Sequence, residues 1–173
     1  MSALTDFRRQ KDEFFGSDPQ SPLTPGQQGA FKGLDYYDDQ PALAFELAPE
    51  PFEHPETIEM QTSTGDVAQY QRWARITFDA GGESGALTIY RDLAGQSYFL
   101  PFQDVNAGKE TYGAGRYLDV QPLDGGRLLV DFNYAYNPYC AYNERWSCPI
   151  PPAENRLAVA IEAGEKVFPD APH

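Results

Sequence analysis

The central part of the chain alternates apolar and polar residues with a period of two, and glycine-rich turns interrupt the pattern. Ile58 and Met60, for example, alternate with Glu59 and Gln61. This period is typical of strands, because successive side chains point to opposite faces of a sheet. The same pattern recurs in TIEMQTS, QYQRWARITFD, ALTIYR, SYFLPF, YLDVQ, RLLVDFN and LAVAIE. Seven short strands separated by turns predict a mainly β fold, an antiparallel meander that closes into a barrel or folds into a two-layer sandwich.

A helix is expected before the strands. Leu4, Phe7, Phe14 and Phe15 share one side at helical spacing, and Gly16 provides a stop. This pattern predicts an N-terminal amphipathic helix that docks on the β body through its three phenylalanines.

The length of 173 residues is that of one domain, residues 1–173. We divide it into the helix (1–16), a proline-rich connecting region expected as ordered loop or linker (17–56), and the β body (57–168). A long irregular C-terminal loop (133–156) belongs to the β body.

Charge excludes several classes of partner. The net charge is −13 and the isoelectric point about 4.4, so neither nucleic acid nor an anionic membrane surface is an expected partner. No apolar run approaches the roughly 18 residues of a membrane span, and the charged N-terminus lacks the apolar core of a signal peptide. A cytoplasmic location is therefore expected, and the sequence indicates no oligomeric state.

Two carboxylates are expected on one face of the sheet. If Leu128, Val130 and Phe132 face the core, Asp131 points the other way, and the same alternation turns Asp119 away from Leu118. A DGG turn joins the two segments, so they are expected to pair. Just before them, Arg116 follows YGAG and offers five donors, either to a ligand or to a structural ion pair with an aspartate.

The stretch DFNYAYNPYCAYNERWSCPIPPAENRL is rich in tyrosine, asparagine and proline. It is too aromatic for a solvated linker, so we expect it folded against the sheet with Tyr136 and Tyr142 buried. It either packs there as architecture or caps a small-molecule pocket. The candidate ligand-binding residues are Arg116, Asp131, Asn133, Tyr136, Asn137, Tyr142, Glu154 and Asn155.

The sequence resembles a known family at several long motifs. FKGLDYY, FQDVNAGKETYGAGRYLD, the tyrosine-rich stretch quoted above and IEAGEK are similar, in this order, to landmarks of the DUF1684 family of uncharacterised prokaryotic proteins. The resemblance runs from about Phe7 to Lys166 and departs at Asn106, where a threonine or serine is common. It implies no activity, cofactor or catalytic residue.

Three functional hypotheses remain open. The first is a small-molecule-binding β domain with a pocket near Arg116 and the tyrosine-rich loop. The second is a hydrolase or isomerase that uses Asp119, Asp131 or Glu154 as acid or base. The third is a structural or protein-interaction module without a pocket.

Nucleophilic and metal chemistry find little support in the sequence. His54 and His173 are its only imidazoles, so no histidine partner for Cys140 is evident. Cys140 and Cys148 are too far apart for a zinc knuckle and read either as buried thiols or as a facultative disulfide. We expect no metal and no cofactor, with a carboxylate–asparagine cation site as the alternative. Its ligands would be Asp119, Asp131, Asn133 and Glu154.

Overall fold

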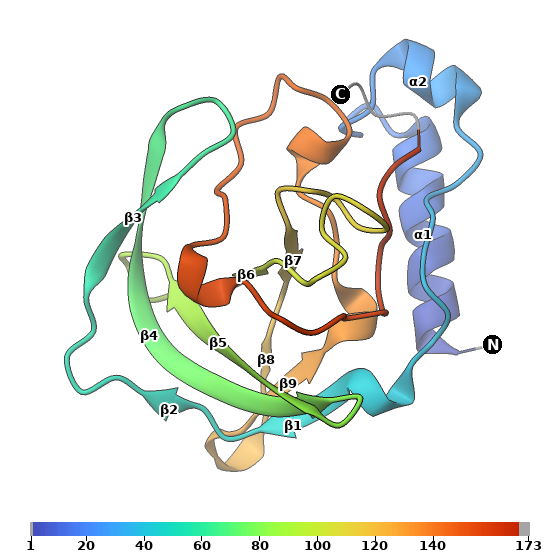
Figure 1. Cartoon of the computed structure of the whole chain (residues 1–173). Coiled ribbons are helices and arrows are strands. Elements are labelled where there is room, and N and C mark those ends of the chain that lie inside the picture. Colours follow the sequence, from blue (N-terminus) through green and yellow to red (C-terminus); the bar gives the residue numbers. More distant parts are fainter. Residues whose placement is uncertain (1, 170–173) are drawn as a thin grey trace.

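The structure is a computed structural model and describes residues 2–169. Two helices come first, α1 (Ala3–Ser17) and α2 (Pro25–Ala30). The strands of the described chain follow as β1 (Ala44–Leu47), β2 (Glu50–Pro51), β3 (Thr57–Gln61), β4 (Val67–Ala80), β5 (Glu83–Arg91), β6 (Tyr98–Phe102), β7 (Arg116–Leu118), β8 (Gln121–Pro122) and β9 (Leu128–Asp131). The long, curved β4 lies at one side of the molecule, and α1 stands at the opposite side (Figure 1).

The strands form two antiparallel sheets. One has the order β2-β4-β5-β6-β7, with β3 paired to β4, and the other has the order β1-β9-β8. The main core draws on both sheets, with Ile76, Leu100, Leu118 and Val130 among its fully buried members. The mainly β, antiparallel prediction is confirmed. Within residues 2–169 the sheets do not close into a barrel, and the arrangement agrees with the sandwich-like alternative.

The segment YLDVQ was expected as one strand, and the structure divides it between the two sheets. β7 pairs with β6, whereas β8 pairs with β9, so the chain changes sheets at Asp119 and Val120. Val120 is buried while Asp119 is exposed. This change of sheet places the Asp119 side chain at the junction of the two sheets, beside α1.

The expected last strand, LAVAIE, is not a strand in the structure. Val159 and Ile161 are buried as the alternation predicted. The first half of this segment still bonds backbone to backbone, since the Leu157 N–H donates to the Gln103 carbonyl and the Val105 N–H donates to the Val159 carbonyl. At Ile161, however, side chains take up the backbone groups that a neighbouring strand would have bonded. The Ile161 N–H donates to Asp104 Oδ2 (2.9 Å), and the Ile161 carbonyl accepts from Arg116 Nη2 (2.9 Å).

The proline-rich connecting region has more regular structure than its composition suggested. Thr24 caps α2 with its side chain, and Gln27 returns a bond to the Thr24 N–H, which is a capping box with Pro25 in the first turn. Further along, β1 adds to β9 in the register Ala44↔Asp131. A loop-or-linker interpretation of this region was therefore incomplete.

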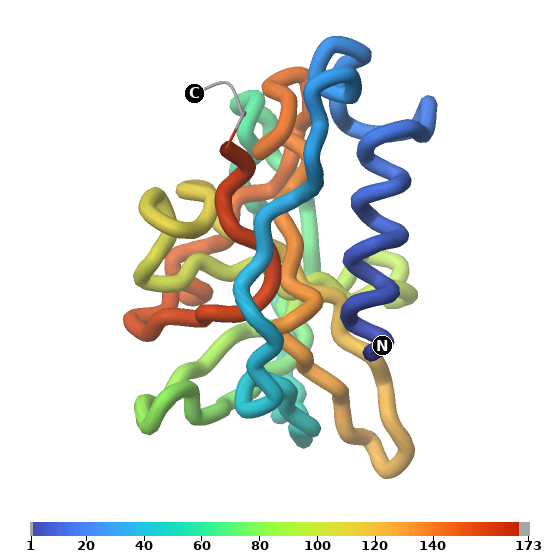
Figure 2. The backbone as a smooth tube through the Cα atoms, turned by 90° about the vertical axis from the view of Figure 1, so that its right-hand side faces the viewer, coloured from blue at the N-terminus to red at the C-terminus, as the bar shows by residue number. Residues whose placement is uncertain are grey.

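The N-terminal helix is present as expected. It runs along one edge of the body, next to the extended segment 31–40 (Figure 2). Leu4 and Phe15 are its buried residues, and Phe15 joins Leu23, Tyr142 and Phe168 in a second apolar cluster. Phe7, in contrast, is 40% exposed.

Candidate functional site

Arg116 is buried under the C-terminal segment and does not line the pocket described below. Its guanidinium donates to the carbonyls of Ile161, Ala163 and Glu165 at 2.5–3.0 Å. Asp104 lies 3.7 Å away and is also buried. This geometry agrees with the structural ion pair that was the alternative to ligand contact, although its partner is Asp104 and not one of the aspartates considered.

The candidate asparagines bond the protein backbone. Asn155 is fully buried and links β5 to β6 through bonds of 2.8 Å with the Thr88 backbone and the Pro101 carbonyl. Asn133 bonds both backbone groups of Gln40. Asn137 donates to the Lys166 carbonyl at 2.9 Å, and its own N–H donates to Glu165. These side chains replace strand partners in an irregular segment.

Tyr142 and Glu165 form a buried polar centre beneath α1. The Tyr142 hydroxyl donates to Glu165 Oε1 at 2.8 Å, and Lys11 Nζ lies 3.2 Å from Glu165 Oε2. The expected burial of Tyr142 is confirmed, since no part of it is exposed. This centre attaches the helix and the tyrosine-rich loop to the same carboxylate.

Glu154 lies apart from the other carboxylate candidates. Arg72 donates two bonds to its carboxylate, at 3.0 and 2.8 Å, and the Tyr90 hydroxyl donates a third. Burial acts to raise the pKa of Glu154, but these hydrogen bonds outweigh it and hold that pKa below its ordinary value.

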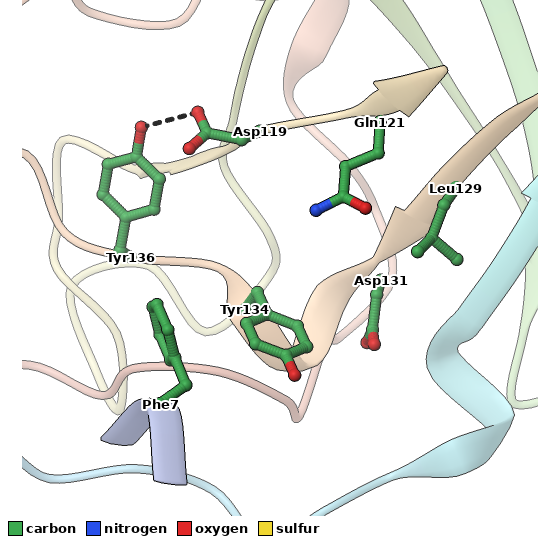
Figure 3. Close-up of a pocket in the computed structure, with 7 residues that line it drawn as sticks. All are labelled: Phe7, Asp119, Gln121, Leu129, Asp131, Tyr134 and Tyr136. Carbon is green, nitrogen blue, oxygen red and sulfur yellow. Dashed lines mark hydrogen bonds between the residues drawn. The ribbon is translucent and has the colours of Figure 1, made fainter. Parts of the chain in front are cut away.

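A pocket of about 350 Å³ lies between α1 and the β8–β9 pair. Its wall holds three aromatic rings, two carboxylates, one amide and one aliphatic side chain (Figure 3). The lining residues are Phe7, Asp119, Gln121, Leu129, Asp131, Tyr134 and Tyr136. The Gln121 amide projects into the space between the rings and the carboxylates (Figure 3).

Both aspartates that alternation placed on one face line the pocket. Asp131 ends β9, whereas Asp119 lies just before β8, which pairs with β9 in the register Gln121↔Leu129. Asp119 Oδ1 accepts from the Tyr136 hydroxyl at 3.0 Å. Asp131 Oδ1 accepts from the Asn133 N–H at 3.0 Å and from its amide at 2.9 Å.

The pocket tyrosines remain protonated at neutral pH. Burial, the Asp119 charge and the bond to Asp119 all raise the pKa of Tyr136. Burial and then the Asp131 charge raise the pKa of Tyr134. Both rings are therefore neutral faces beside negative charges.

Comparison with known proteins agrees with the motif resemblance. A family model described as a protein of unknown function (DUF1684) matches residues 29–166. The chain belongs to the DUF1684 family. It is also similar to an uncharacterized protein of Haloarcula marismortui, whose solution NMR structure superposes with a TM-score of 0.72. The two chains are 38% identical, and the match covers 94% of this chain and 91% of that one. A search of curated proteins finds no match.

Of the residues named from sequence, Asp119, Asp131 and Tyr136 meet in the pocket of this DUF1684 protein. The others do not line it. Phe7, Gln121, Leu129 and Tyr134 were missed as lining residues. The alternation that turns the two aspartates away from the core also turns Gln121 and Leu129 to the same face, so these two residues could have been predicted. Phe7 belongs to a helix whose docking position the sequence does not reveal.

The two cysteines of this DUF1684 protein are free thiols. The Cys140 N–H donates to Cys148 Sγ at 3.4 Å, and the Tyr112 hydroxyl lies 3.5 Å from Cys140 Sγ. A hydrogen bond with the Cys148 thiol is the main cause that lowers the pKa of Cys140 to about 6, against the effect of burial. The same bond raises the pKa of Cys148.

Metal-ligating side chains do not gather in the described part of this DUF1684 protein. Within residues 2–169 no group of three or more histidine, cysteine, aspartate and glutamate side chains is placed to hold a metal ion. Of the four residues considered for a cation site, Asp119 and Asp131 line the pocket and Asn133 is bonded to Gln40. His54 is exposed beside Glu53, and His173 lies outside the described residues. No helix of the described chain is long and apolar enough to cross a membrane.

Proposed function

We propose that this DUF1684 protein is a small-molecule-binding domain whose ligand occupies the pocket between α1 and the β8–β9 pair. The observation that carries the proposal is the composition of that pocket. Aromatic faces and a few convergent polar groups around about 350 Å³ are the usual properties of a small-ligand site. The small-molecule-binding hypothesis drawn from the sequence is retained. The proposed site, however, is the face that holds Asp119 and Asp131 and not the surroundings of Arg116.

The pocket has a rigid floor and one helical wall. Leu129 and Asp131 belong to β9, which is paired on both sides by β1 and β8. Phe7 comes from α1, and its ring packs against Tyr134 with centroids 5.0 Å apart. A ligand placed there would contact both the sheet and the helix, so its binding should stabilise the docked position of α1.

The acid–base hypothesis concerns the same pocket. Asp119 and Asp131 both line it, whereas Glu154 does not. Any catalytic role of Glu154 would need a different site.

A pocket-filling variant tests the proposal. A thermal-shift screen of metabolites identifies compounds that raise the melting temperature, and NMR titration then maps which residues respond. Gln121→Trp places an indole where the Gln121 amide projects into the pocket, on an exposed position of a short strand. We expect it to abolish the ligand-induced rise and leave the unliganded protein folded.

Gln69→Trp is the matched control, because Gln69 is an exposed strand residue of β4 and does not line the pocket. It should bind every hit as the wild type does. If the screen yields no compound whose binding Gln121→Trp removes, the proposed function fails. The result would then favour the hypothesis of a structural or protein-interaction module without a pocket.

A further inference from the structure

We infer that the ligand of this pocket is a small organic cation carrying a quaternary or methylated ammonium group. The inference deepens the proposed function and rests on it. It follows from three features of the pocket: its charge, its aromatic walls and its lack of a metal-binding arrangement.

The first feature is charge. Asp119 and Asp131 contribute two negative charges, and among the described lining residues none carries a positive charge. Each carboxylate uses Oδ1 for its protein partners, and within residues 2–169 no hydrogen bond occupies either Oδ2. The net charge of −13 adds a long-range attraction for cations. An anionic ligand would be repelled by the net charge of the protein at long range and by the two carboxylates inside the pocket.

Arg8 is one nearby cation, and its charge acts to lower the pKa of Tyr134. Its guanidinium, however, lies 4.5 Å from the centroid of the Tyr36 ring and donates to the Tyr37 carbonyl. Lys11 is another nearby cation. Its ammonium lies 5.2 Å from the centroid of the Tyr136 ring. It is, however, only 3.2 Å from the buried carboxylate of Glu165, so its charge is already paired. Among residues 2–169, neither Lys11 nor Arg8 forms an ion pair with a pocket carboxylate.

The second feature is the aromatic wall. Phe7, Tyr134 and Tyr136 line one end of the pocket, and the edge-to-face pair of Phe7 and Tyr134 meets at 64°. Aromatic faces attract cations through the ring quadrupole, and cages of such rings are the usual binding site of quaternary ammonium groups. The Tyr136 hydroxyl donates to Asp119, which joins an aromatic wall to a carboxylate. A trimethylammonium group buries its methyl groups against the rings and needs no hydrogen-bond acceptor.

The third feature separates an organic cation from a metal ion. Calcium and magnesium need six or more oxygen ligands, supplied by the protein or by water. The described chain brings no group of three metal-ligating side chains together, and the pocket lining adds three aromatic rings and a leucine to its two carboxylates. This surface is suited to a cation with an apolar exterior.

A pair of isosteric probes tests the charge requirement directly. Choline and 3,3-dimethyl-1-butanol have almost the same shape, but only choline carries a charge, because carbon replaces nitrogen in the alcohol. We expect the wild-type protein to bind choline at least about tenfold more tightly than the alcohol in NMR titrations at low salt. Chemical-shift changes should centre on Phe7, Tyr134 and Tyr136.

Variants assign the effect to the pocket. Asp119→Asn and Asp131→Asn keep the shape and one acceptor oxygen while removing one charge each, and each should weaken choline binding several-fold. Asp124→Asn is the matched control, because Asp124 lies in the turn between β8 and β9 and does not line the pocket. Phe7→Leu should also weaken choline binding, whereas Phe14→Leu on the same helix should not.

The outcomes distinguish this inference from the proposed function. Equal affinity for the two probes, removed in both cases by Gln121→Trp, would overturn the cation inference and leave the pocket as a general small-molecule site. Choline binding that survives Gln121→Trp, or no choline binding at millimolar concentration, would also overturn the inference. The proposed function itself fails only if the metabolite screen gives no compound that depends on this pocket.

Discussion

Arg116 shows how a residue with the chemistry of a ligand contact serves the fold instead. Its guanidinium spans three carbonyls of the segment 161–165, which belongs to no strand of the described chain and has only an isolated bridge to Tyr36. The carboxylate of Asp104 balances its charge at 3.7 Å and in turn accepts the Ile161 N–H. One buried ion pair therefore fixes the backbone that would otherwise need a strand.

Arg116→Ala is expected to lower the free energy of unfolding by about 3–5 kcal/mol, because it leaves the Asp104 charge and three carbonyls buried without partners. Urea denaturation measures the loss. Arg156→Ala, at an exposed arginine in the same half of the chain, serves as the control and should change stability by less than about 1 kcal/mol. An Arg116→Ala protein of normal stability that no longer binds ligand would return Arg116 to the binding site.

At the scale of elements, the phenylalanines of α1 differ in how deeply the body covers them. Phe15 is 2% exposed and packs edge-on to Tyr142 with centroids 5.0 Å apart. Phe7 is 40% exposed and faces the pocket. Helical spacing placed them on one side of the helix but did not indicate which of them the body covers.

Phe15→Ala is expected to cost about 3–5 kcal/mol of stability, the range for deleting a fully buried aromatic side chain. Phe7→Ala, on the same helix, should cost less than about 1.5 kcal/mol, because less apolar surface leaves contact. Thermal and urea unfolding of the two variants compare them directly. Similar losses for both would mean that the helix is anchored through the pocket wall as well.

The sequence predicted those elements whose burial alternates. Leu128, Val130 and Phe132 are buried as their period required, and Asp131 turns to the other face. The same signal failed at LAVAIE, since alternation reports burial of side chains and not the partners of the backbone. There, the backbone of Gln103 and Val105 partners Leu157 and Val159. Asp104 and Arg116 partner Ile161 from distant positions in the chain.

The candidate site was predictable only in part for a similar physical reason. Pairing across a short turn is local, so the sequence could place Asp119 and Asp131 on one face, and both line the pocket. Tyr142, Asn137 and Asn155 have the side chains of a binding site, but long-range contacts with Glu165, Lys166 and Thr88 engage them inside the protein. The positions of these three residues in the sequence do not indicate which distant residues they contact.

For the whole molecule, the dominant electrostatic effect should be repulsion among carboxylates. The chain has 26 acidic and 13 basic residues. Several ion pairs of the described chain are exposed, including Arg9–Glu13 and Arg127–Glu46, and such pairs stabilise by only about 0–1 kcal/mol each. The buried pairs Arg116–Asp104 and Lys11–Glu165 are screened weakly by salt. Added salt therefore weakens net repulsion more than it weakens attraction.

We expect the melting temperature at neutral pH to rise by a few degrees as NaCl increases from about 10 mM to about 500 mM, which shortens the screening length from roughly 30 Å to a few Å. For a chain of this size a few degrees corresponds to about 1 kcal/mol. Near pH 4.4 the net charge approaches zero, so repulsion is largely removed and the same salt series should leave the melting temperature almost unchanged. A fall in melting temperature with salt at neutral pH would show that attractive pairs prevail over the excess of carboxylates, and a rise of equal size at pH 4.4 would show that salt acts through hydration rather than charge.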